Sequence, residues 1–348
     1  MALCSVPRLW AAPPAPPAPR AFPSSTVWTV TRTAGVTVAP AVAAGHFILP
    51  LSTGEIVGLS LEDGGQRWSL PVRADTALTT VGADVLLTDG ERLTALDAAS
   101  GVTHWQATLA ARAVVPVAVS TDAVFVLTAA PAVESHRVTD GSLIWRHALP
   151  ALPVAAAVPS EARLFVPTAD GIVALEQTTG QVAWQRALGG LPTAVGTSRA
   201  LVLVGSADNY FYALDGRTGR IRWQWRTGAD IVAGLIVSDR QVIFASLDNV
   251  IRNLSLPHGA LRWAAPALER PVYGVVAFGR AVVASGIGGA GAAISVADGS
   301  ALGAVTVVGD VATAPVTFTR QATTGLIVVS QQASGDLTVT ALTPTSRP

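Results

Sequence analysis

The chain has 348 residues, half of them hydrophobic, and its 23 basic side chains balance 23 acidic ones. Charged residues make up only 13% of the sequence, so the concentrated cationic surface that nucleic-acid binding requires is not expected. Every basic residue other than histidine is arginine, and the lack of lysine excludes P-loop, Schiff-base and kinase-type lysine chemistry.

Residues 1–23 are rich in proline and alanine and predict an extended, disordered tether. Cys4 is the only cysteine, so neither an intrachain disulfide nor a cysteine-based zinc site can form. A cysteine followed by a Pro-rich spacer is how a mature bacterial lipoprotein begins, which makes Cys4 a candidate lipidation site; an inert tail cysteine is the alternative. The preceding Met-Ala-Leu fits a lipidation box poorly, and it is too short for a signal core. No later apolar run is long enough for a transmembrane helix.

Residues 24–344 are predicted to form one domain of short strands, followed by a tail at 345–348. The clearest repeated stretch is Tyr212–Trp223, which indicates a strand, a turn closed by Thr-Gly and a second strand carrying tryptophan. The same Gly-x-x-x-Trp spacing ends at tryptophans that lie 37 to 40 residues apart, namely Trp68, Trp105, Trp145, Trp184, Trp223 and Trp263. Four short strands in each unit of about 39 residues are typical of a β-propeller.

The two ends of this row of repeats differ from the rest. The seventh unit has Gly303 where a tryptophan is due, and the eighth stops near Leu342 before any tryptophan strand. Trp28, however, lies 40 residues before Trp68. We therefore predict that the N-terminal strand completes the last blade and closes the ring, which removes a free sheet edge. The prediction is an all-β, eight-bladed propeller of four-stranded antiparallel blades, with seven blades as the alternative.

The repeat resembles that of the pyrroloquinoline-quinone-type propellers, roughly Tyr-Ala-Leu-Asp-x-x-Thr-Gly-x-x-x-Trp. The match runs from Ser25 to Leu342 and is most specific at Tyr212–Trp223, Thr94–Trp105 and Ile172–Trp184. In that family each tryptophan packs between blades. The resemblance therefore implies a structural, inter-blade role for Trp28, Trp68, Trp105, Trp145, Trp184, Trp223 and Trp263.

Two branches of that family bear on function. The quinone-dependent dehydrogenases are periplasmic and much longer, because insertions over the ring axis build their cofactor chamber, and many carry an adjacent Cys-Cys disulfide. Units of 37 to 40 residues leave no room for such insertions here, and one cysteine cannot form that disulfide. In its length, blade count and Cys-led tether the chain is similar to the non-enzymatic BamB branch. That branch is typified by BamB, a lipoprotein subunit of the β-barrel assembly machinery in the bacterial outer membrane.

The sequence offers few candidate sites. Five histidines in different units lack metal-site spacing and are expected to be solvated or at blade edges (His46, His104, His136, His147 and His258). Four aspartates beside the repeat turns are expected to hydrogen-bond their own backbone (Asp97, Asp140, Asp215 and Asp298). One cluster near blades five and six combines aromatic and charged groups, as binding hot spots do (Trp225, Arg226, Asp230, Asp248, Asn249 and Arg252). For this cluster, inter-blade packing with a salt-bridged turn is the alternative.

The favoured hypothesis is a non-catalytic, BamB-like scaffold in an extracytoplasmic compartment of a bacterium, periplasmic or anchored to the outer membrane. It predicts protein partners, with β-barrel assembly components as the specific version, and no nucleic acid, cofactor, metal or catalytic residue. The alternatives are a minimal quinone-dependent dehydrogenase and a ligand-binding sensor propeller.

Overall fold

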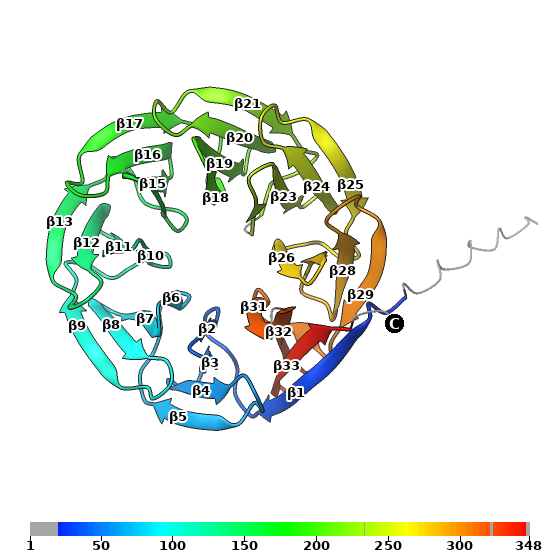
Figure 1. Cartoon of the computed structure of the whole chain (residues 1–348). Coiled ribbons are helices and arrows are strands. Elements are labelled where there is room, and N and C mark those ends of the chain that lie inside the picture. Colours follow the sequence, from blue (N-terminus) through cyan, green and yellow to red (C-terminus); the bar gives the residue numbers. More distant parts are fainter. Residues whose placement is uncertain (1–19, 233, 321–322, 346–348) are drawn as a thin grey trace, which may run out of the picture.

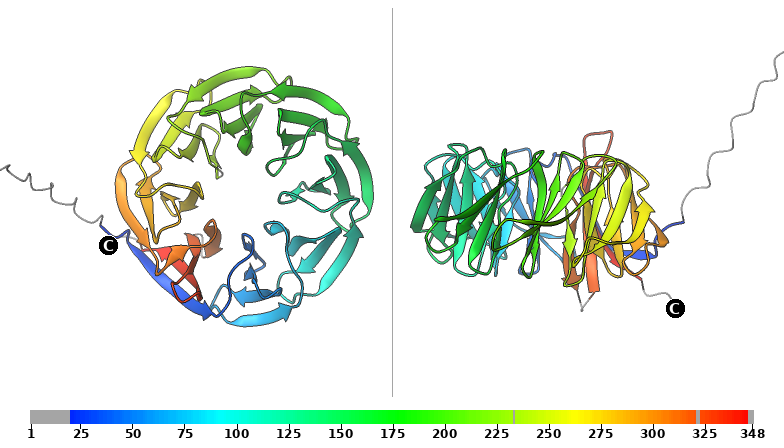
Figure 2. Two further views of the ribbon diagram at one scale, coloured as in Figure 1. Left: turned by 180° about the vertical axis from the view of Figure 1, so that it is seen from behind. Right: turned by 90° about the horizontal axis from the view of Figure 1, so that it is seen from above.

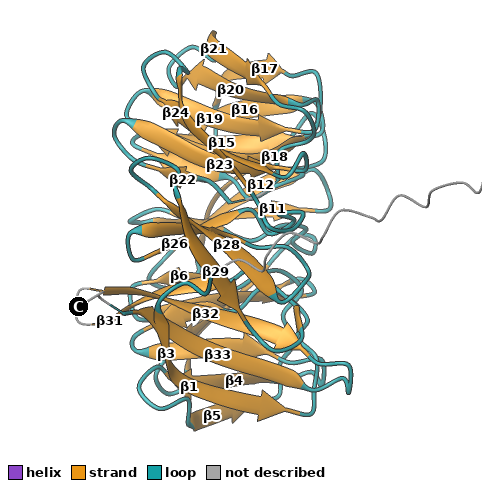
Figure 3. Ribbon diagram, turned by 90° about the vertical axis from the view of Figure 1, so that its right-hand side faces the viewer, coloured by secondary structure: helices purple, strands orange, loops and turns teal. Residues whose placement is uncertain are grey.

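The computed structural model describes residues 20–345 except 233 and 321–322, and all regular elements in this part of the chain are β-strands. They form eight antiparallel sheets that stand as blades around a ring (Figure 1). Seen edge-on, the ring is a disc whose strands run between two faces (Figures 2 and 3). The predicted eight-bladed propeller is confirmed, and the seven-bladed alternative is wrong.

Blades 1–7 follow one plan, in which four consecutive strands are ordered from the ring centre outward. Their strands are, for blade 1, β2 (Ala41–Ala43), β3 (His46–Pro50), β4 (Ile56–Ser60) and β5 (Gln66–Leu70); for blade 2, β6 (Thr79–Val81), β7 (Asp84–Asp89), β8 (Arg92–Asp97) and β9 (Thr103–Thr108); for blade 3, β10 (Ala118–Val119), β11 (Ala123–Thr128), β12 (Ala132–Arg137) and β13 (Leu143–Ala148); for blade 4, β14 (Val158–Ser160), β15 (Arg163–Thr168), β16 (Gly171–Glu176) and β17 (Val182–Ala187); for blade 5, β18 (Pro192–Ser198), β19 (Leu201–Ser206), β20 (Tyr210–Asp215) and β21 (Ile221–Arg226); for blade 6, β22 (Ile236–Val237), β23 (Gln241–Ser246), β24 (Val250–Ser255) and β25 (Leu261–Pro266); and for blade 7, β26 (Val275–Phe278), β27 (Ala281–Ala284), β28 (Ala290–Ser295) and β29 (Ala301–Thr306).

Blade 8 is built from both ends of the chain. It contains β30 (Asp310–Val311), β31 (Val316–Arg320), β32 (Thr323–Gln331), β33 (Leu337–Pro344) and, outermost, β1 (Ser24–Arg32). Strand β1 pairs antiparallel with β33 and places Trp28 opposite Ala341. The N-terminal strand therefore closes the ring, as the position of Trp28 predicts (Figure 1).

The alternating strand direction gives the disc two different faces. Turns between the first and second strands of a blade, and between the third and fourth, lie on one face, which we call the turn face. Loops between the second and third strands, and the connections between blades, lie on the other, which we call the loop face. Loops gather on both sides of the edge-on disc in Figure 3.

The hydrophobic core is divided among the junctions between blades. At the junction of blades 4 and 5, for example, Phe165 and Trp184 pack against Val202 and Leu214. Middle strands such as β11 are buried along their whole length, whereas outer strands such as β21 alternate exposed and half-buried residues. Each buried side chain of this size stabilises the fold by about 1.5–3 kcal/mol.

The turn-face turns are closed by aspartate and glycine. The Oδ1 atom of Asp140 accepts a hydrogen bond from the Ser142 amide at 2.9 Å, and Asp298 accepts one from the Ser300 amide at 3.1 Å. Asp215 accepts one from the Arg217 amide at 3.1 Å. Asp97 bonds the amide of Ser100 at 2.8 Å, one residue further along. The predicted turn role of these aspartates is confirmed.

Candidate functional site

The seven repeat tryptophans lie on outer strands, each beside a turn of the next blade around the ring. Each indole Nε1 donates a hydrogen bond of 2.7–3.1 Å to a backbone carbonyl of that turn. The donor–acceptor pairs are Trp28–Leu61, Trp68–Ala98, Trp105–Val138, Trp145–Gln177, Trp184–Gly216, Trp223–Leu256 and Trp263–Val296.

Glycine makes this close approach of the indole ring possible. A Cβ atom on Gly219 would lie 2.5 Å from Cε3 of Trp184, and Gly219 has a φ of 68° that side chains disfavour. The glycine of each Gly-x-x-x-Trp stretch therefore serves the tryptophan of the preceding blade.

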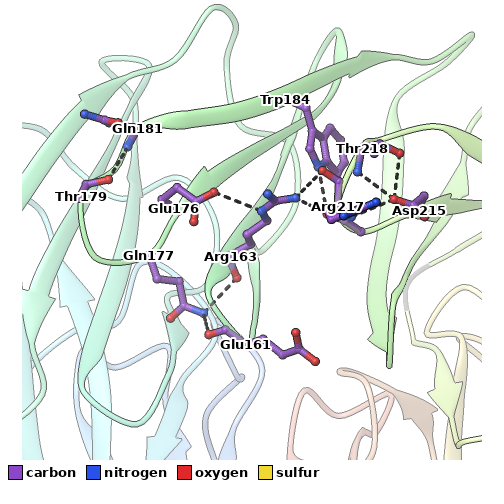
Figure 4. Close-up of polar contacts among 11 residues, drawn as sticks. Glu161, Arg163, Glu176, Gln177, Thr179, Gln181, Trp184, Asp215, Arg217 and Thr218 are labelled. Carbon is purple, nitrogen blue, oxygen red and sulfur yellow. Dashed lines mark hydrogen bonds and ion pairs between the residues drawn. The ribbon is translucent and has the colours of Figure 1, made fainter.

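Further polar contacts join blades 4 and 5 at the turn face (Figure 4). The guanidinium of Arg163 donates to the carbonyl oxygens of Gly216 and Arg217, at 2.9 and 2.6 Å, and its Nε donates to Glu176 at 3.3 Å. The Gly216 carbonyl thus accepts hydrogen bonds from both Arg163 and Trp184. These contacts bind the two blades to each other.

The seventh blade differs at Gly303, where the sequence lacks its tryptophan. The amide of Phe22 donates to the carbonyl of Ala304 at 2.7 Å, and the amide of Ala304 donates to the carbonyl of Arg20 at 2.8 Å. Residues 20–22, which the sequence places in the tether, therefore lie parallel to β29. Phe22 is buried in the core of blades 7 and 8, with its ring 5.2 Å from that of Phe278.

The aromatic and charged cluster of blades 5 and 6 lies on the loop face. Asp248 and Arg252 pair with each other at 2.7 Å, and the Asp248 carboxylate also accepts bonds from the Ser246 hydroxyl and the Gly228 amide. This is the salt-bridged turn named above as the alternative. Burial opposes the charged form of Asp248, but the hydrogen bonds from Arg252, Ser246 and Gly228 outweigh it and hold its pKa at about 2.

The other members of the cluster are divided between the interior and the surface. The carbonyl of Asp230 accepts the amide of Leu247 at 2.8 Å, which brings its loop beside the turn of Asp248. Asn249 has a φ of 62°, the left-handed conformation that asparagine tolerates at a turn. Trp225 is half-buried against the core of blades 5 and 6, and Arg226 is exposed.

Three exposed apolar side chains lie on neighbouring loops of the loop face around blade 7. Leu268, Ile287 and Val308 are 44%, 58% and 69% exposed. The amide of Val311 donates to the carbonyl of Ile287 at 2.7 Å, so the loops of Ile287 and Val308 are joined. A Cβ atom on Gly288 would lie 2.4 Å from the Glu269 carboxylate, so the loop of Leu268 lies beside them as well.

A buried charged group between blades 2 and 3 was missed by the sequence reasoning. Glu134 is 0% and His136 is 2% exposed, so the prediction that all five histidines are solvated or at edges is wrong for His136. Glu134 accepts a hydrogen bond from the amide of Ala110 at 3.0 Å, and its Oε1 atom lies 3.3 Å from Nε of Arg146 in an ion pair. Aligned on the tryptophans, Glu134 and His136 occupy positions held by Val173 and Leu175 in blade 4, and that comparison could have revealed the pair.

The hydrogen bonds of Glu134 and His136 indicate which of their atoms carry protons. Nδ1 of His136 lies 2.9 Å from the carbonyl of Gly141, which can only accept, so Nδ1 carries a proton. Nε2 lies 3.2 Å from the Glu134 carboxylate. That contact needs one further proton, either on the imidazole or on the carboxyl group. The buried pair is thus satisfied by groups of the chain itself.

One grouping among the described residues has the donor types of a metal site. Asp84, Asp97 and His104 offer ligand atoms within 4.8 Å of one another. They lie where the second, third and outer strands of blade 2 meet the turn face, and not on the inner strands near the ring axis. Asp97 is already engaged by the hydroxyl and the amide of Ser100, which hold its pKa below the usual value.

Comparison with known families supplies the relationship that the geometry alone does not. The sequence model of the family "Outer membrane protein assembly factor BamB" matches residues 89–200 and 169–344. The chain belongs to this family. A comparison with curated protein sequences gives no significant match.

Solved structures share the BamB-type fold over nearly the whole chain. BamB from Moraxella catarrhalis is 19% identical, with a TM-score of 0.72 over 91% of this chain and 99% of that one. The computationally designed protein Ika8 is 17% identical, with a TM-score of 0.74 over 90% and 98%. Quinohemoprotein alcohol dehydrogenase from Comamonas testosteroni is 12% identical, with a TM-score of 0.71 over 94% and 78%. At such identities these likenesses establish the fold alone.

Two predictions from the sequence concern membrane attachment: no transmembrane helix, and a candidate lipidation site at Cys4. In the part of the chain that the structure covers, there is no helix with the length and apolar character to cross a membrane. Cys4, the candidate lipidation site, lies outside the described residues, as do residues 346–348 of the predicted tail.

Proposed function

We propose that this BamB-family chain is a non-catalytic scaffold that binds other proteins, as an extracytoplasmic accessory of outer-membrane protein assembly in a bacterium. Membership of the family carries this proposal. The short connections between blades support it, because they present broad faces and leave the chain without the long insertions that a cofactor chamber requires.

The loop face around blades 5–8 is the surface we assign to the partner. Exposed apolar side chains that gather on one face can mark an interaction site, and Leu268, Ile287 and Val308 lie exposed on neighbouring loops of the loop face. Trp225 and the exposed Arg226 end an outer strand on the same face. Aromatic and arginine side chains are what protein-binding hot spots favour.

The test is a binding experiment with a matched control. The full chain, immobilised, is exposed to detergent-solubilised outer membranes, and β-barrel assembly components are expected to be retained. Leu268→Asp with Ile287→Asp should abolish retention. Leu143→Asp with Val182→Asp changes exposed apolar residues at the start of two outer strands, 51% and 41% exposed, and should leave retention intact. Retention of no assembly component by the unchanged chain would overturn the proposal.

A quinone-dependent dehydrogenase is the competing function, because such enzymes share the fold. The Asp84–Asp97–His104 grouping does not suit their cofactor, since it lies on the second, third and outer strands of one blade, where they meet the turn face, rather than over the ring axis. Incubation of the purified chain with pyrroloquinoline quinone and Ca²⁺ should give no bound chromophore and no dye-linked alcohol oxidation. A stoichiometric chromophore would reverse the assignment.

A lipid anchor at Cys4 is part of the same proposal. The cysteine precedes a Pro-rich spacer that would hold the propeller away from a membrane surface. Expression from the native locus with a labelled fatty acid should label the protein, and Cys4→Ser should remove the label. An unlabelled native protein would remove the anchor from the proposal and leave the scaffold role standing.

A further inference from the structure

Charge is distributed unevenly around the turn face. The relevant residues are those of its turns, together with one strand residue on either side of each turn. On blades 1–4 they are Glu62, Asp63, Asp84, Asp97, Asp122, Asp140, Glu161 and Glu176 against Arg137 and Arg163. On blades 5–8 they are Arg199, Arg217, Arg220, Arg240, Arg280 and Arg320 against Asp215, Asp239 and Asp298. We call these halves the acidic arc and the basic arc.

Many of these groups are free to meet a partner. Glu62, Asp122 and Glu161 are exposed, and within the described residues none has an arginine at ion-pair distance. The same holds for Arg217, Arg220, Arg240, Arg280 and Arg320 with respect to carboxylates in that part of the chain. Other charges of the two arcs are paired inside the chain, among them Asp63 with Arg67, Glu176 with Arg163 and Asp215 with Arg222. The eight groups named above are therefore the ones available to a partner.

A disc with this charge pattern is complementary to itself. When two copies meet turn face to turn face, they can be related by a two-fold axis that lies in the plane between them. Rotation about this axis turns one copy over, so its blades run around the ring in the opposite sense to those of the other copy. If that axis runs along the boundary of the two arcs, blade 4 meets blade 5 of the second copy. Blades 3, 2 and 1 then meet blades 6, 7 and 8. Each acidic blade is thus opposed by a basic or neutral one.

We propose that the turn face binds a second copy of this chain in a two-fold, face-to-face dimer that pairs the acidic arc with the basic arc. The proposal is independent of the scaffold role, which uses the opposite face. The dimer leaves the loop faces of both copies outward, so the assembly would present two partner-binding surfaces.

Exposed charges give such a contact its salt dependence. Exposed ion pairs are individually weak, and complementary charge acts mainly on orientation and on the rate of encounter. Raising NaCl from about 20 mM to about 500 mM shortens the Debye length from about 20 Å to about 4 Å. We expect the dimer dissociation constant, measured by sedimentation velocity on the full chain, to rise by about tenfold or more over this range.

Charge-reversal variants test the geometry. Arg217→Glu with Arg220→Glu reverses the outer turn of blade 5, and Glu161→Arg reverses the inner turn of blade 4, the blade that lies opposite blade 5 of the second copy. Glu161 has a φ of 51°, and Arg199 occupies the corresponding turn position of blade 5 with a φ of 49°, so arginine suits this backbone. The matched control is Arg73→Glu with Arg92→Glu, the same change of charge on the loop face.

Each reversal alone should abolish the dimer at low salt, and an equimolar mixture of the two variants should restore it, because one reversed blade 5 then meets one reversed blade 4. The control variant should dimerise like the unchanged chain. Thermal unfolding of each variant distinguishes loss of association from loss of folding. A monomeric unchanged chain at low salt, a control that dissociates equally, or a folded mixture that stays monomeric would each overturn the proposal.

Discussion

The backbone of Phe22 occupies the space into which a side chain on Gly303 would project. A Cβ atom built on Gly303 would lie 2.7 Å from the amide nitrogen of Phe22, and Gly303 has a φ of 141°. Blade 8 offers no turn of the usual kind to receive a tryptophan, because its outer strand begins at the N-terminal side of the chain. Phe22 instead supplies an aromatic ring to this junction, and the exceptional glycine makes room for it.

Substitution of Gly303 should detach this segment. In Gly303→Trp the repeat is restored in sequence, but the indole cannot coexist with the backbone of residues 20–22. Without its hydrogen bonds to β29, the segment of residues 20–22 should open at a free-energy cost lower by about 1–2 kcal/mol. We therefore expect trypsin to cleave after Arg20 at least about tenfold faster than in the unchanged chain. Mass spectrometry of the products measures this. Equal cleavage rates would show that residues 20–22 do not depend on Gly303.

The tryptophan–glycine contact should dominate the stability of each junction. Gly219→Ala forces a Cβ atom to 2.5 Å from the Trp184 ring, and we expect about 3–4 kcal/mol of destabilisation. Gly335→Ala is the matched control, because Gly335 has a φ of 89° but no atom within 4 Å; it should cost only about 1 kcal/mol. Denaturant midpoints measure both. Equal losses would mean that backbone strain, and not the indole, accounts for the effect.

Replacing Glu134 alone should destabilise the fold far more than replacing Glu134 and His136 together. Glu134→Val alone leaves His136 and Arg146 without their acceptor and should destabilise the chain by about 3–5 kcal/mol. Glu134→Val with His136→Leu reproduces the residues of blade 4 and should recover most of that loss. His136→Leu alone completes the double-mutant cycle. A double variant as unstable as Glu134→Val would contradict the coupling.

Acid should weaken blades 5 and 6 through two aspartates. Hydrogen bonds from Arg222 hold the pKa of Asp215 at about 2, and Asp248 titrates at about 2 as well. Both values lie below the unfolded value of about 3.9, so the stabilisation is fully present above about pH 4 and is lost as pH falls toward 2. Asp215→Asn and Asp248→Asn should therefore flatten the decline of thermal stability between pH 5 and about 2.5. An unchanged decline would contradict this assignment.

The repeat itself made the ring predictable. The spacing of the tryptophans gave the unit length, and Trp28, together with the unfinished last unit, indicated that the ends of the chain meet. Turn aspartates were predictable because their hydrogen bonds reach only two or three residues along the chain. Information of short range, repeated many times, was sufficient for the architecture.

Contacts that cross between strands or blades were not predictable in the same way. His136 is buried because Glu134 lies two residues earlier on the same strand and Arg146 comes from the next strand. By contrast, the pairing of Asp248 with Arg252 spans only four residues, and the sequence indicated it as the salt-bridged alternative. Residues 20–22 read as tether because nothing in their composition reveals β29 as their neighbour.

The pairing of β1 with β33 in blade 8 means that the ring closes only at the end of synthesis. The hydroxyl groups of Ser25 and Thr343 lie 3.1 Å apart although the residues are 318 positions apart in sequence. Strand β1 is made before the other strands, yet its pairing partner β33 is made last, so a strand carrying Trp28 waits unpaired while the other blades form. Pairs so distant in sequence form slowly, and unpaired edges invite aggregation. The ring can therefore close only after the whole chain has been made, and until then the edge of β1 stays open to pairing with other chains.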